Sequence, residues 1–404
     1  MILKLIWRNL WRNHRRTLIT TASITFAVMF CILMQSFQKG AFDNLIKNVV
    51  GYYSGYVQIH KSGYWNERVL DNCFELNDTL IHKIKQQKNV LDFVPRLETF
   101  TLASFNNTTK ACMLIGTDPI KEKQLTHLNE KIIEGTYFTI DDESVLIAEG
   151  LAKRLNAKLN DTLVLFGQAY QGTLAAGKYK IIGLLHLASP EMNNSFVYLP
   201  LKASQVLLNS ENRITTLALI LDNPLEKIPL VSSLRTQLSS EYEIMDWEEM
   251  MPEISNHIKA DGASFYIFSA VLYLIIGFGF FGTVLMMTAE RKREFGMLIS
   301  IGLKKINLGL ILLGETLLIT ALGVASGILL SIPLVVYLNR NPIQFTGEMA
   351  KAYEKFGFEP VIPTAIDSTV FISQAGFVLI LTLLIGLYPI WHIHKLDAVK
   401  ALRN

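Results

Sequence analysis

The sequence predicts an α-helical membrane protein with four transmembrane helices and a large α+β extracytoplasmic domain inserted between the first two. Three observations lead to this fold class. The 404 residues are 50% hydrophobic and 18% charged, with a mean hydropathy of +0.30, which is more apolar than an ordinary soluble domain. The apolar residues concentrate in four uncharged runs long enough to cross the ~30 Å of hydrocarbon in a bilayer. Lysine and arginine gather on one side of these runs.

The four apolar runs are interpreted as membrane spans. The first run follows a basic start, as a secretory signal does, but it is too long and no small-residue cleavage site follows it. A retained span is therefore favoured over a signal peptide. The expected division of the chain is an amphipathic cytoplasmic interfacial helix at 1–17, spans at 18–37, 264–288, 306–338 and 370–393, an outer domain with stalk ends at 38–263, a cytoplasmic loop at 289–305, an external loop at 339–369 and a cytoplasmic tail at 394–404.

The distribution of charge sets the orientation. The first 17 residues carry five basic residues and no acidic one, whereas the segment 39–263 has 22 basic and 27 acidic residues. Because loops rich in Lys and Arg stay on the cytoplasmic side, both termini and the loop 289–305 are expected inside and the large segment outside. The net charge of +3 averages these two faces, so it does not indicate a nucleic-acid partner.

The outer domain is expected to mix helices and strands. Short β-rich runs separated by turn residues indicate strands, and apolar residues at spacings of three and four indicate helices between them. Two of the three cysteines, Cys73 and Cys112, lie in this domain, and whether they pair stays open. The expected strands are 55–60, 100–105, 111–116, 144–149, 162–167, 178–185, 195–200 and 215–221, and the expected helices are 76–87, 149–156 and 225–239.

Two cytoplasmic segments have amphipathic patterns. At the start, Ile6, Trp7, Leu10 and Trp11 share a face, which favours a helix lying in the membrane interface over a merely basic flank. The loop after the second span reads TAERKREFGMLISIGLKK and mixes charges with an apolar set before a glycine, Gly302, that can cap a helix. A short surface helix that docks a partner protein is predicted here, and a solvated loop that only sets topology is the alternative.

Motifs of catalysis are absent from the sequence pattern. The string GTLAAGKY at 172–179 approaches a phosphate-binding loop, but Tyr179 stands where Ser or Thr should hold magnesium, so this stretch is interpreted as the tip of a β-hairpin. His392 and His394, two apart on a helix, point to different sides. With no nucleophile, base or metal-ligating cluster recognised, we expect no catalytic residue, no metal site and no enzymatic activity.

Some residues within the spans also suggest function. Glu315 is the one formally charged residue inside a span, so it is expected to face the helix bundle or to reach the cytoplasmic interface. An apolar cavity for acyl chains is hypothesised from aromatic and aliphatic residues of the first two spans, with ordinary lipid-facing or packing surface as the alternative. The cavity residues are Phe26, Phe30, Phe37, Phe265, Phe268 and Leu272.

Several segments together give the chain a family resemblance. They are LIWRNLWRNHRRTLIT, GYVQIHKSGYW, IIEGTYFTIDDESVLIAEGLAKRLNAKLNDTLVL, ERKREFGMLISIG and YPIWHIHKLDAVKALR. With these segments in this order, the chain resembles the FtsX-like permeases of ABC transporters. Its four-span plan without a fused ATPase is most similar to LolC and LolE, the lipoprotein-releasing permeases, whereas the MacB efflux pumps carry an ATPase on the same chain.

The resemblance implies partners and a mechanism. A separate cytoplasmic ABC ATPase would bind ATP and magnesium, a second permease would complete a homodimer or a pair with a paralogue, and this chain would bind no cofactor itself. It would extract lipoproteins from the bacterial inner membrane; export of a drug, peptide or other amphiphile, or a non-transporting FtsX-like signalling role, are the alternatives. The hairpin 167–178 lacks the prolines and apolar tip expected of a hook for a periplasmic carrier, so carrier recruitment stays open. The residues implied to couple to the ATPase are Glu290, Arg291, Arg293, Glu294, Phe295, Gly296, Leu298 and Gly302, with Phe295 and Leu298 filling an apolar pocket of the ATPase.

Overall fold

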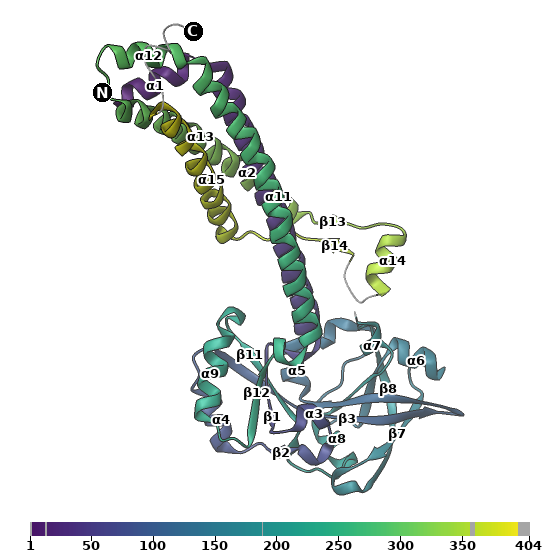
Figure 1. The fold of residues 1–404 in the computed structure, drawn as a ribbon. Helices are drawn as coiled ribbons and strands as arrows, with labels where there is room; N and C mark the ends of the chain where they lie inside the picture. Colours follow the sequence, from purple (N-terminus) through teal and green to yellow (C-terminus); the bar gives the residue numbers. More distant parts are fainter. Residues whose placement is uncertain (1, 13, 188, 356–359, 395–404) are drawn as a thin grey trace. The chain divides into compact units, whose positions relative to one another are not determined.

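The fold is taken from a computed structural model, which describes residues 2–12, 14–187, 189–355 and 360–394 (Figure 1). The chain forms two compact units. The first unit contains Met1–Asp43, Ile258–Ile343 and Val361–Asn404, and the second contains Asn44–His257 and Gln344–Pro360. The tail predicted for 394–404 lies, beyond His394, outside the described residues.

The first unit contains four helices that by length and composition could cross a membrane, and each of them includes one of the four predicted apolar runs. Two of these helices are longer than the spans themselves. The first continues without a break to Val49, and Gln38 Nε2 donates to the backbone oxygen of Asp261 in the second at 3.4 Å. The four helices are α2 (His14–Val49), α11 (Pro252–Glu290), α13 (Lys305–Arg340) and α15 (Ser368–His394).

Glycines allow α13 to pack closely against α2. A Cβ atom at Gly323 would lie 2.7 Å from the Cβ of Ile24, and one at Gly327 would lie 2.8 Å from the Cβ of Val28. No side chain larger than hydrogen fits at either position, as in close small-xxx-small helix contacts. In α11, by contrast, a Cβ at Gly279 or Gly282 would meet no atom within 4 Å, so these two glycines make no close helix contact among the described residues.

Short elements complete the first unit, and some of those between α13 and α15 fall within Gln344–Pro360, which belongs to the second unit. The amphipathic helix α1 forms as predicted, but it is oriented with Ile6 and Leu10 buried in the bundle and Trp7 and Trp11 exposed. The segment between α13 and α15 contains two short strands and a helix. These elements are α1 (Ile2–Arg12), α12 (Lys292–Ser300), β13 (Ile343–Gln344), α14 (Glu348–Lys355) and β14 (Val361–Ile362).

The second unit is built on a ten-stranded mixed sheet with the order β12-β1-β11-β3-β4-β9-β6-β8-β5, and β7 pairs with β3 and β8. A strand forms at each of the eight predicted places, but the prediction 100–105 covers only the end of β3, which starts at Val90. The sheet also contains β5 and β12, which the sequence did not predict. The strands are β1 (Val57–Lys61), β2 (Phe74–Glu75), β3 (Val90–Phe105), β4 (Thr108–Thr117), β5 (Ile132–Gly135), β6 (Ser144–Ala148), β7 (Thr162–Gln168), β8 (Leu174–Leu185), β9 (Phe196–Pro200), β10 (Arg213–Ile214), β11 (Thr216–Leu221) and β12 (Tyr242–Asp246).

The long strand β3 connects two parts of this sheet. Its first half pairs with β11, and its second half pairs with β4 and β7. The three predicted helices are confirmed with shorter bounds, and α4 and α9 contribute to a core around β1 and β11. The helices are η1 (Val50–Ser54), α3 (Tyr64–Glu67), η2 (Leu70–Asn72), α4 (Asp78–Lys85), α5 (Pro119–Thr126), η3 (Leu128–Lys131), α6 (Glu149–Leu155), η4 (Tyr170–Gly172), α7 (Pro190–Asn193), α8 (Leu201–Leu207), η5 (Pro224–Glu226), α9 (Lys227–Gln237) and α10 (Trp247–Met250).

The cysteines do not form a disulfide in this structure. Cys73 and Cys112 are both buried, and both carry free thiols. Burial raises the pKa of the Cys112 thiol to about 11, and the hydrogen bond with Thr101 opposes that shift. A protonated, buried thiol of this kind behaves as a small apolar side chain. Cys73 and Cys112 are therefore two separate cysteines in the core and are not paired in this structure.

Candidate functional site

The predicted docking helix forms as α12 and ends where the sequence indicates. Gly302 has a φ of +105°, a left-handed conformation that favours glycine. The amide of Gly302 donates to the oxygen of Ile299 at 3.0 Å, and the amide of Leu303 donates to the oxygen of Leu298 at 3.0 Å. These two bonds are the Schellman motif, which satisfies the last carbonyls of a helix. The glycine cap therefore fixes the end of α12.

One face of α12 is buried in the same chain. Phe295 is completely buried and packs with Leu308, Leu312 and Ile393. Gly296 is buried as well. In this structure the Phe295 ring is enclosed by its own chain, so its side chain is not exposed to fill the pocket of the ATPase that was expected for it. Phe295 instead holds α12 onto α13 and α15.

The opposite face of α12 offers exposed apolar side chains. Met297 is 52% exposed, Leu298 is 40% exposed and Ile301 is 78% exposed. The exposed basic residues Lys292 and Arg293 accompany them. A short helix with an apolar centre and charged neighbours is a composition suited to docking a protein partner.

A buried ion pair joins α12 to α13. Arg291 Nη1 donates to Glu315 Oε2 at 2.7 Å, and Asn9 Nδ2 of α1 donates to Glu315 Oε1 at 2.8 Å. The Glu315 side chain is 2% exposed and the Arg291 side chain 10%. Glu315 thus faces the bundle, which is one of the two orientations predicted for it. A charge in this position is stable because both carboxylate oxygens are hydrogen-bonded.

A second set of ion pairs ties the acidic residues of this region to the N-terminal helices. Arg12 Nη2 donates to both oxygens of Glu294, at 2.7 and 2.6 Å, and Arg291 Nε donates to Glu294 at 3.3 Å. Arg16 forms an ion pair with Glu290. Burial raises the pKa of Glu294, but the hydrogen bonds from Arg12 and Arg291 outweigh it and hold the pKa below its usual range. Glu294 is therefore ionised at neutral pH.

These ion pairs change the role of three residues predicted to meet the ATPase. Glu290, Arg291 and Glu294 were expected to contact the partner, and in this structure they bind other helices of their own chain. The sequence reasoning used Arg12 and Arg16 only to set topology and did not connect them to this site. Arg12 ends α1 and Arg16 lies in the first turn of α2, so their convergence on Glu294 and Glu290 becomes visible only in the folded chain. The network links α1, α2, α11, α12 and α13, so a displacement of α12 acts on all of them.

The hypothesised acyl-chain residues do not enclose a cavity within one chain. Phe26, Phe30 and Phe268 are 65%, 49% and 72% exposed. The other members, Phe37, Phe265 and Leu272, are half-buried. An enclosed cavity at this place would need a second surface opposite these helices.

The hairpin predicted around 167–178 forms from β7 and β8. Gly167 pairs with Ala175 and Gln168 with Leu174, so most of the GTLAAGKY string lies on β8 and only its first residues form the tip. Leu174 is 84% exposed beside that tip. The tip itself is formed by the polar or small residues Gln171, Gly172 and Thr173, as the sequence indicated, and Leu174 is the exposed apolar side chain next to it.

Comparison with known families identifies the class of protein. Residues 17–229 match the MacB-like periplasmic core domain, and residues 266–398 match the FtsX-like permease C-terminal domain. The first match alone spans more than half of the chain, so the protein belongs to the FtsX-like, MacB-like family of ABC transporter permeases. Membership implies a membrane protein with a periplasmic domain that works with an ATPase and a second permease. No curated protein matches the sequence at a significant level.

Two solved structures each match about half of the chain. The periplasmic region of MacB from Actinobacillus actinomycetemcomitans is 14% identical with a TM-score of 0.37, and the match covers 52% of this chain and 98% of that one. The extracellular domain of the noncanonic ABC-type transporter YknZ from Gram-positive bacteria is 15% identical with a TM-score of 0.34, covering 48% of this chain and all of that one (100%).

Proposed function

We propose that this chain is the permease subunit of a lipoprotein-extracting ABC transporter in the bacterial inner membrane. Both termini lie in the cytoplasm and the second unit lies in the periplasm, as the basic inner segments indicate. A separate ATPase binds ATP and magnesium, and its movement passes through α12 into the spans. The chain itself transmits force and catalyses no reaction.

The observation that carries this proposal is the construction of α12. Its buried face is attached to the bundle by Phe295 and by the Arg291–Glu315 pair, while Leu298 and Ile301 stay exposed. A helix attached in this way cannot be displaced without moving α13. This is the arrangement that coupling to a partner ATPase requires.

Exposed aromatic side chains on the first two spans support an acyl-chain substrate. Phe30 and Phe268 would line a cavity if a second permease, identical or paralogous, faced them. Each CH₂ group buried there contributes ~0.8 kcal/mol, so a lipid with several chains would be retained until it is displaced. Lipoproteins extracted into this cavity would then leave toward the periplasm, with or without a carrier at the hairpin.

Export of a drug, peptide or other amphiphile is the second candidate. The match of residues 17–229 to the MacB-like domain favours it, because that domain is shared with efflux-type permeases. Both functions use the same coupling helix, and they differ in what enters the cavity.

Photocrosslinking distinguishes the two functions. A photoreactive amino acid at Phe30 should capture acylated lipoprotein in inner-membrane vesicles, and ATP should reduce the yield. The same probe at Ile380, an exposed residue of α15, is the matched control for random lipid contact. Capture of an added amphiphilic drug, with no lipoprotein adduct at Phe30, would overturn the lipoprotein assignment in favour of export.

A further inference from the structure

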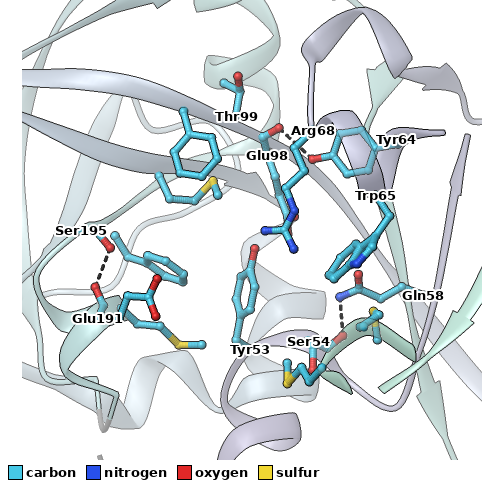
Figure 2. A pocket seen from close by; sticks show the side chains of 16 residues that line it. Tyr53, Ser54, Gln58, Tyr64, Trp65, Arg68, Glu98, Thr99, Glu191 and Ser195 are labelled. Carbon is cyan, nitrogen blue, oxygen red and sulfur yellow. Dashed lines mark hydrogen bonds between the residues drawn. The ribbon is translucent and has the colours of Figure 1, made fainter. Parts of the chain in front are cut away.

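A small pocket opens in the second unit, where the middle of β3 passes close to α3 and α7 (Figure 2). Its volume is about 210 Å³. That volume is below the ~300–1,000 Å³ of sites that enclose drug-sized ligands, so it suits a small molecule or one end of a larger one. The apolar part of its wall is made of Phe100, Met113, Met192, Phe196, Met250 and Met251.

Three buried polar atoms of this pocket lack a hydrogen-bond partner among the described residues. They are Ser54 Oγ, Gln58 Oε1 and Glu98 Oε1, and their residues are 1%, 2% and 6% exposed. Buried polar groups in folded proteins are nearly always hydrogen-bonded, and an orphaned one costs free energy. A carboxylate oxygen and an amide oxygen can only accept, so the missing partner is a donor.

The neighbouring arginine does not supply that donor. Arg96 donates to both oxygens of Glu122, at 2.8 and 2.6 Å, and to the backbone oxygen of Tyr53 at 2.7 Å. Its Nη1 atom is 3.6 Å from Glu98 Oε1, too far for a hydrogen bond. Burial raises the pKa of Glu98, and the positive charge of Arg96 with the hydrogen bonds of Tyr53 and Thr216 offsets this only in part. Thr216 Oγ1 donates to Glu98 Oε2 at 3.3 Å, so Oε1 is the carboxylate oxygen that faces no cation at hydrogen-bond distance.

Aromatic rings next to Glu98 complete a site for positive charge. The Arg68 guanidinium lies over the Trp65 ring, with its carbon 4.2 Å from the ring centroid. Figure 2 shows Arg68, Glu98 and Tyr53 pointing into the same space, with Trp65 and Gln58 along one wall. Cations bind favourably over the faces of Trp and Tyr. Arg68 is itself exposed and follows the end of α3, so its side chain can leave without breaking the core.

We infer that this pocket binds an organic ammonium ion with an apolar body. The ammonium group donates hydrogen bonds to Glu98 and Gln58 beside the Trp65 ring, and the apolar body lies against the methionines and phenylalanines. The ligand takes the place that the Arg68 guanidinium holds in the empty pocket. The site belongs to the second unit alone, so the inference does not depend on what the transporter moves.

Calorimetric titration of the full-length chain in detergent tests this site with three probes of similar shape and different charge. The probes are 2-phenylethylammonium, 2-phenylethanol and 3-phenylpropionate. We expect the ammonium to bind at least tenfold more tightly than the alcohol, and the carboxylate to bind most weakly. Stronger binding of the carboxylate would make the pocket an anion site. Equal heats from all three probes would mean that they partition into the detergent. No binding of any probe would mean that the pocket holds only water. Any of these three results would overturn the inference.

Variants locate the binding. Glu98→Gln should weaken ammonium binding at least tenfold, whereas Arg68→Ala should strengthen it several-fold, because a competing positive charge is removed. If Arg68→Ala weakens binding, the inference is wrong. Since Glu98→Gln can disturb the buried network, Trp65→Leu, at a partly exposed ring, provides a second test and should also weaken binding. Arg213→Ala is the matched control, because Arg213 lies over the ring of Tyr170 elsewhere in this unit, and it should change nothing.

Discussion

Removing Arg291 should destabilise the membrane unit strongly because it leaves Glu315 buried and unpaired. The ion pair is 2.7 Å long and the Glu315 side chain is 2% exposed. Breaking a buried pair on one side typically costs ~3–5 kcal/mol, so Arg291→Met should reduce the free energy of unfolding by about that amount. The exposed Arg12–Glu294 pair provides the contrast: Arg12→Ala should cost less than about 1 kcal/mol.

Replacing both partners should restore most of the loss. In Arg291→Met/Glu315→Leu no charge remains buried, and such replacements are often neutral or stabilising. Unfolding by titration with a denaturing detergent, followed by circular dichroism, measures the loss in free energy of unfolding for Arg291→Met, for Glu315→Leu and for the double variant. If the single losses add within ~0.5 kcal/mol in the double variant, or if Arg291→Met costs less than about 1 kcal/mol, the two side chains are not energetically coupled and this reasoning is refuted.

The double variant also separates stability from coupling. It should fold and insert, but it lacks the ionic link between α12 and α13, so ATPase stimulation by the permease should fall well below that of the unmodified protein. Stimulation at the normal level would show that the ionic link between α12 and α13 is not needed for coupling.

Three other outcomes are expected. Ile301→Asp, at a side chain that is 78% exposed, should abolish copurification of the ATPase while leaving thermal unfolding unchanged; retained copurification would remove this face from the docking surface. Leu174→Asp should weaken crosslinking to a periplasmic carrier at least tenfold, whereas Leu225→Asp, at an equally exposed leucine, should not; equal effects would exclude the hairpin as a specific site. His60 is fully buried, and burial lowers its pKa to about 4 from 6.5. The unfolded chain therefore binds more protons between those values, and the stability of the second unit should fall by about 3 kcal/mol as pH drops from 6.5 to 4. His60→Gln should flatten this dependence in thermal unfolding measured across that pH range, and an unchanged slope would assign it to other groups.

The membrane spans and most strands were predictable because their signals are local. An uncharged run of 20 apolar residues needs no knowledge of its neighbours, and β6 has four apolar residues after Ser144, with all five residues buried. The missed elements lack such signals. In β12 only Ile244 is buried, and α5 has the polar sequence PIKEKQLT. The helix α5 is held by its N-cap Asp118 and by the buried pair of Glu122 with Arg96, a contact that becomes visible only in the folded chain.

In the candidate site, too, the features with a local sequence signal were predictable and those that depend on distant residues were not. The end of α12 at Gly302 was predictable because a glycine cap acts within a few residues. The buried face was not, because Phe295 packs on Ile393, almost one hundred positions later, and Arg291 pairs with Glu315 across the start of the next span. From sequence alone, an aromatic residue and two charges on a short cytoplasmic helix look available to a partner. Their actual partners depend on where three helices converge.

The glycine contact between α2 and α13 limits how these helices can move. At Gly323 and Gly327 the backbone of one helix touches the side chains of the other, with Ile24 and Val28 seated against it. Sliding along the helix axes would drive those branched side chains into the next turn, where neighbouring residues carry Cβ atoms. The close packing at these two positions thus prevents α2 and α13 from sliding past each other. A displacement of α13 is therefore expected to move α2 with it as one rigid body.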